Sequence, residues 1–102
     1  MADAAETQEE RQLREAVAKL QIGDLLAQTL VSVTSLAFAK LDPATHDLDQ
    51  ARLAIESLRA VVPLLEGQAD EGILRDLESA RSSLQLAYAR AVDEERAGDA
   101  ER

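Results

Sequence analysis

Few side chains in this sequence could carry out chemistry. His46 is the only histidine, and the chain has no cysteine. Cysteine-bound metals and thiolate nucleophiles are therefore excluded, as is a metal site built on two histidines. His46 directly precedes a predicted helix start and has no visible companion for acid–base chemistry. We therefore expect its imidazole to be solvated.

Two groups of oxygen-bearing side chains could be imagined as reactive. Asp47 and Asp49 could bind a metal, but helix capping explains both, and no glycine-bearing calcium loop follows them. Ser32, Thr34 and Ser35 lack the lysine spacing or the strand-turn-helix setting of an activated nucleophile. The four glycines are scattered singly and form no phosphate loop. We expect no catalytic residue, no cofactor and no metal, and predict that the protein is not an enzyme.

Arginines are the remaining groups with a chemical use. Guanidinium groups suit phosphates and other anions, so a small anionic ligand held by Arg75, Arg81 and Tyr88 is an alternative candidate site. Glutamates stand three or four residues from several arginines, as Glu78 does from Arg81, and pairing within a helix would use most of this charge. Ion pairing is the simpler interpretation of the series Arg52, Arg59, Arg75, Arg81 and Arg90.

The composition predicts an acidic, all-α protein. A length of 102 residues suits one domain, and a formal charge of −9 argues against nucleic acid as a partner, because phosphates require a positive face. The 19 alanines and 16 leucines, set against 2% aromatic residues, are typical of helices. The lack of cysteine and of a leader pattern before the first helix predicts a cytoplasmic location.

Hydrophobic periodicity predicts a three-helix core together with a peripheral N-terminal helix at about residues 7–21. The chain ends carry too few apolar residues to offset the entropy of ordering them. We therefore expect a flexible acidic tail at 1–6, a single helical domain at 7–92 and a flexible charged tail at 93–102. The core helices are predicted at about 24–41, 47–66 and 70–92.

Capping and breaking residues support these boundaries. Thr7 and Glu10 have the spacing of a capping box, and Asp47 is placed to cap the helix that follows it. Gly23 is expected to break the pattern between the first two helices. Pro63 should kink the third helix or end it early.

The segment 24–41 is apolar around most of its circumference. Such a helix must be covered on several sides, and two further helices of one short chain leave part of it bare. We expect a second copy to cover it, with a dimer favoured, although another protein would serve equally. A membrane span is disfavoured, because the uncharged residues 25–39 rise only about 22 Å against about 30 Å of hydrocarbon. The candidate interface residues are Leu26, Leu30, Val31, Val33, Ala37 and Phe38.

Two blocks of sequence carry a resemblance. The first is DLDQAR at 47–52 with Ile55 and Leu58, and the second is LRD at 74–76 with SLQLAY at 83–88. These blocks resemble a small bacterial helical family known only as a domain of unknown function. The resemblance covers about residues 22–92 and leaves out 7–21. It implies a compact helical domain without an assigned activity and favours a link to translation.

These observations predict a non-catalytic interaction or scaffold module that acts through self-association. One alternative is a small regulator or enzyme that binds an anionic ligand through helix-borne arginines. A third is peripheral membrane association through the segment 24–41.

Overall fold

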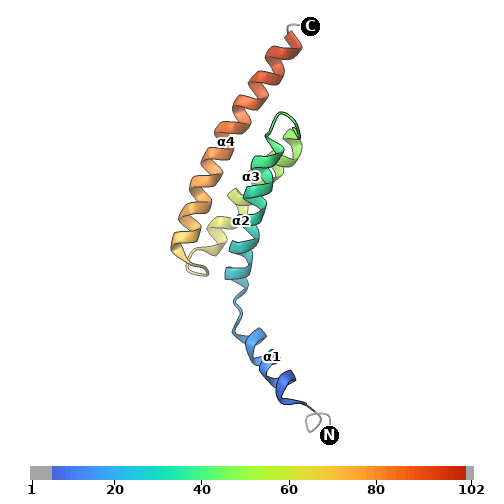
Figure 1. Cartoon of the computed structure of the whole chain (residues 1–102). Coiled ribbons are helices and arrows are strands. Elements are labelled where there is room, and N and C mark those ends of the chain that lie inside the picture. Colours follow the sequence, from blue (N-terminus) through green and yellow to red (C-terminus); the bar gives the residue numbers. More distant parts are fainter. Residues whose placement is uncertain (1–5, 101–102) are drawn as a thin grey trace.

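The computed structural model describes residues 6–100, and within them the fold is all-α, as predicted. Helices α2, α3 and α4 pack together as a three-helix core, and α1 precedes them (Figure 1). A short 3₁₀ helix, η2, follows α3, and this part of the chain contains no strand. The bounds are Gln8–Lys19 for α1, Ile22–Lys40 for α2, Leu48–Val61 for α3, Val62–Leu65 for η2 and Glu71–Ala100 for α4.

The predicted caps are present. The Thr7 hydroxyl accepts a hydrogen bond from the Glu10 amide at 3.1 Å, and the Glu10 carboxylate accepts one from the Thr7 amide at 3.4 Å. Both halves of the capping box are thus formed. The Asp47 carboxylate accepts a hydrogen bond from the Gln50 amide at 3.3 Å. These bonds satisfy amides that a helix leaves free at its start.

Pro63 ends α3 early, one of the two outcomes predicted for it. The α-helix stops at Val61, and Pro63 lies within η2. Gly67 then takes a positive φ of 76°, a conformation that glycine adopts without steric cost. The chain reverses here and leads into α4, which runs back along the core (Figure 1).

The predicted charged tail at 93–102 is wrong for residues 93–100, because α4 continues to Ala100 rather than ending near residue 92. Extending an existing helix adds a hydrogen bond for every residue fixed, and the alanine, glutamate and arginine residues of this stretch favour helix. Of the acidic tail predicted at 1–6, residues 1–5 lie outside the described residues, as do 101–102 at the other end.

The core lies where α2, α3 and α4 meet. Leu58 of α3 and Leu84 of α4 are fully buried at its centre. Ala27 and Ala51 are also fully buried, and such small side chains allow close contact between helices. The remaining buried apolar residues are Leu30, Ala37, Ala54, Ile55, Val62, Leu65, Leu74 and Leu77.

Gly23 does not break the helical pattern, contrary to the prediction. The break falls at Leu20 and Gln21, which are both extended, and Gly23 lies in the first turn of α2. There it packs against the turn before α4, where a Cβ atom on Gly23 would overlap the carbonyl oxygen of Gln68. The glycine is therefore required for a close approach of two backbones.

Helix α1 stands apart from the core. It packs against none of the other elements within residues 6–100, and its position is peripheral, as predicted. Figure 1 shows it extending beyond the start of α2, and the described chain reaches 74 Å along its longest axis. Its apolar residues Leu13, Val17 and Leu20 are exposed.

Candidate interaction surface

Exposed leucines lie on α2, α3 and η2. Leu36 of α2 and Leu53 of α3 line the same groove between these helices. Leu25 lies 11 residues before Leu36 on α2, about three turns, which puts it on the same side of that helix. Leu64 follows the end of α3, in η2. All four side chains are 60–73% exposed. We call this surface the α2–α3 face and define it by Leu25, Leu36, Leu53 and Leu64.

The groove in this face is shallow and apolar. Its volume is about 210 Å³, below the roughly 300–1,000 Å³ typical of small-molecule pockets. Val33, Ala37 and Ala54 contribute apolar surface to it. A groove of this size suits the side chains of another helix better than it suits a cofactor.

The α2–α3 face carries little charge. Lys40 is the one charged residue lining the groove among residues 6–100, and Gln50 and Ser57 are its other polar residues. In a chain with 30% charged residues, this is an unusual composition for exposed surface. Uncharged surface with large apolar side chains marks sites where proteins associate.

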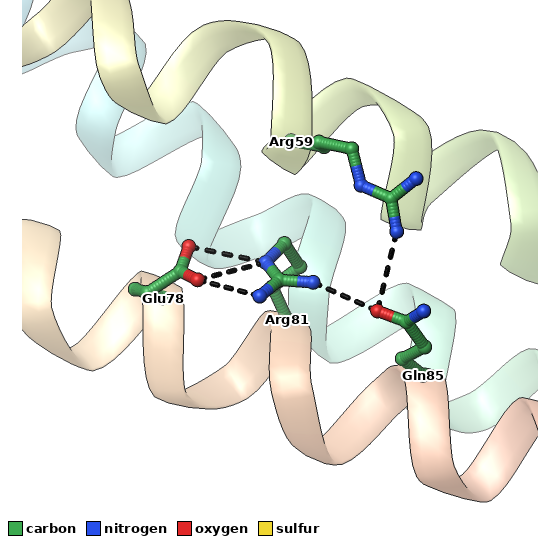
Figure 2. A network of polar contacts seen from close by, with 4 residues as sticks. All are labelled: Arg59, Glu78, Arg81 and Gln85. Carbon is green, nitrogen blue, oxygen red and sulfur yellow. Dashed lines mark hydrogen bonds and ion pairs between the residues drawn. The ribbon is translucent and has the colours of Figure 1, made fainter.

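The side between α3 and α4 is charged. Figure 2 shows Arg81 held by Glu78 through three hydrogen bonds of 2.6–3.1 Å. Arg81 and Arg59 both donate to the side-chain oxygen of Gln85, at 2.8 and 3.2 Å. The bond from Arg81 lowers the pKa of the Glu78 carboxyl, and the same bond raises the pKa of the Arg81 guanidinium.

The candidate anion site is not assembled. Arg81 is paired with Glu78, and Arg75 lies near Glu66 and Glu71 at the start of α4. Tyr88 stands 13 residues beyond Arg75 on the same helix, about 20 Å along the axis. It lines a hollow with His46, Asp47, Asp49 and Glu95, where three carboxylates would repel an anion.

The structure buries some of the predicted interface residues and leaves others exposed. Leu30 and Ala37 are buried in the chain's own core, so their placement on an intermolecular surface is wrong. Val33 is half-buried beside the α2–α3 groove. Leu26, Val31 and Phe38 are 40–43% exposed, and Val31 faces α4 rather than α3.

Sequence reasoning missed Leu53 and Leu64. An exposed leucine alone carries no signal. Leu25 and Leu36 belong to the predicted 24–41 segment but are not among its candidate interface residues. Their spacing of 11 residues, about three helical turns, is a signal that they share one side of α2.

The polar side chains considered for chemistry have structural explanations. Buried Thr34 donates to the carbonyl oxygen of Leu30 at 2.8 Å, and Ser35 donates to that of Val31 at 3.3 Å. Nε2 of His46 lies 4.0 Å from a carboxylate oxygen of Glu95. Residues 6–100 contain no group of three or more histidine, aspartate or glutamate side chains able to hold a metal ion.

No protein family, curated protein or solved structure was found to match this chain. The resemblance to a bacterial helical family therefore stays a prediction.

Proposed function

We propose that this protein is a non-catalytic interaction module that self-associates through the α2–α3 face. The observation that carries the proposal is the pair of exposed leucines, Leu36 and Leu53, at a groove with little charge, with Leu25 and Leu64 exposed on the same two chain segments, whereas the α3–α4 side carries ion pairs. Exposure of such a face to water is unfavourable, and a second copy supplies apolar surface that covers it.

The energetic argument favours a symmetric dimer. Full burial of a leucine side chain contributes about 1.5–3 kcal/mol. In a two-fold interface every residue of the face is buried twice, once on each copy. Association has to overcome a cost of about 4–15 kcal/mol. Burial of eight leucine side chains, four from each copy, contributes a free energy of comparable size. A substitution that removes one leucine from each copy should therefore weaken the dimer.

Association with a membrane is the second candidate. Within the described residues, α2 is the one helix long and apolar enough to cross a bilayer, judged by length and composition. Anionic lipids repel a chain of net charge −9, which disfavours this candidate. Flotation with neutral and anionic liposomes separates the two, because a self-associating module stays with the soluble fraction in both.

The experiment compares three substitutions at equally exposed leucines. Leu36→Asp and Leu53→Asp place a charge on the α2–α3 face, whereas Leu86→Asp places one elsewhere, and all three leucines are 60% exposed. Light scattering after size exclusion should report dimers for the wild type and Leu86→Asp, and monomers for the other two. Circular dichroism should report the same helix content for all four proteins. The proposal would be contradicted if Leu86→Asp weakened the dimer as much as Leu36→Asp and Leu53→Asp do.

A further inference from the structure

Helix α1 presents a second uncovered apolar surface on the same chain. It is amphipathic, with Leu13, Ala16, Val17 and Leu20 along one side, and all four are exposed. A 12-residue helix is marginally stable by itself, and most helices in proteins depend on packing of their apolar side. The apolar stripe of α1 therefore needs a partner surface.

The dimensions of α1 fit the α2–α3 face. Its 12 residues span about 18 Å, and Leu25 to Leu36 span about 16 Å along α2. A narrow apolar stripe on one helix suits the groove between two others, which is the position that a fourth helix takes in a four-helix bundle. Ala16 within the stripe is small and would allow α1 to lie close to the groove between the exposed Leu36 and Leu53.

Charged residues indicate the direction in which α1 would lie along the α2–α3 face. The start of α1 carries Glu9 and Glu10, and Lys40, at the end of α2, is the one charged residue lining the groove in the described part of the chain. An antiparallel arrangement of α1 against α2 brings these opposite charges toward each other. It also places Leu20 near the Leu25 end of the face.

The connection between α1 and α2 points to a partner copy. Leu20 and Gln21 are both extended, with ψ of 137° and 133°, and they lead α1 away from its own core (Figure 1). To cover its own α2–α3 face, α1 would have to fold back at these two residues. A second copy related by a two-fold axis near Gln21 runs in the opposite direction and brings its α2 antiparallel to this α1.

We propose that α1 of each copy docks antiparallel along the α2–α3 face of the other copy, in a reciprocal exchange of helices. This inference rests on the self-association proposed above and specifies what covers the face.

Disulfide trapping tests the inference, because the natural chain has no cysteine. In the double variant Leu13→Cys/Leu36→Cys, mild oxidation should yield covalent dimers on a non-reducing gel. Each single-cysteine variant and Leu13→Cys/Leu86→Cys should stay monomeric on the same gel. Faster-migrating monomers with an internal disulfide, or no cross-link at all, would overturn the inference.

A second measurement separates this inference from the proposed function. Leu13→Asp/Val17→Asp should weaken the dimer about tenfold or more, a change of about 1.4 kcal/mol or more, while Ala18→Asp, on the other side of α1, leaves it unchanged. If the α1 variant dimerises like the wild type while Leu36→Asp does not, the α1 inference fails and the proposed function stands. A wild type that is monomeric throughout overturns both.

Discussion

At the scale of single residues, burial separates leucines that stabilise the fold from leucines that are free to bind. Leu84 is fully buried and Leu86, two residues along α4, is 60% exposed. Leu84→Ala should lower the free energy of unfolding by about 2–5 kcal/mol, because it leaves a cavity at the centre of the core. Leu86→Ala should change it by less than about 0.5 kcal/mol. Urea denaturation followed by circular dichroism measures both, and equal losses would contradict the described core.

The Glu78–Arg81 pair predicts a small pH dependence of stability. The pKa of Glu78 is lowered in the folded chain by its hydrogen bond to Arg81, so the carboxylate stabilises the fold at pH values above its unfolded pKa. This contribution is lost as the pH falls through the lowered folded pKa. Glu78 is 54% exposed and its interaction with Arg81 is screened by water, so the contribution should stay below about 1 kcal/mol.

The test is the free energy of unfolding of Glu78→Gln and of the wild type, measured across the acidic range. The wild type should be the more stable at neutral pH, and the difference should vanish in acid. In Glu78→Gln/Arg81→Gln this part of the pH dependence should be absent as well. A difference between wild type and Glu78→Gln that grows in acid would contradict the assignment.

At the scale of elements, the contact of α2 with the turn before α4 depends on Gly23. Gly23→Ala should destabilise the protein by about 1–3 kcal/mol, because its methyl group would meet the Gln68 carbonyl oxygen. Gly98→Ala is the matched control, since Gly98 lies in α4 with open space around it and the change should gain up to about 1 kcal/mol. Thermal unfolding measures the midpoint temperature of each variant, which should fall for Gly23→Ala and rise for Gly98→Ala. Stabilisation by both would contradict the close approach.

The helices themselves could be predicted from sequence because their signals are local. The capping box at Thr7 and Glu10, the Asp47 cap and the stop at Pro63 each depend on residues within one or two turns. The sequence predicts an end of α4 eight residues before the observed one, because a charged composition is typical both of disordered tails and of exposed helices. Gly23 was interpreted as a break because its tertiary contact is not visible in the local sequence.

The buried side of α2 could not be predicted, because the helix is apolar on too many sides. Ala27 and Thr34 are buried whereas Leu26 is 40% exposed, so the side that faces the core is rotated toward the smaller residues. Close packing of three helices favours small side chains at the contact, and this selects alanine over leucine. The rotation leaves Leu25 and Leu36 in water, which is what creates the candidate surface.

At the scale of the whole molecule, the chain is long and asymmetric. Its core has one face with little charge and one with ion pairs (Figure 2). Helix α1 extends beyond the core (Figure 1), and its apolar residues are exposed. A small three-helix core buries limited apolar surface, so association adds stability that a single copy lacks. The central claim is therefore that two copies are needed to cover what one copy exposes.

Sedimentation equilibrium of the wild-type protein over a range of micromolar concentrations tests this claim most directly. The claim predicts a mass of twice the 11.1 kDa of one chain, with dissociation toward a single chain on dilution. A mass of 11.1 kDa at every concentration, with helix content and unfolding unaffected by dilution, would contradict it.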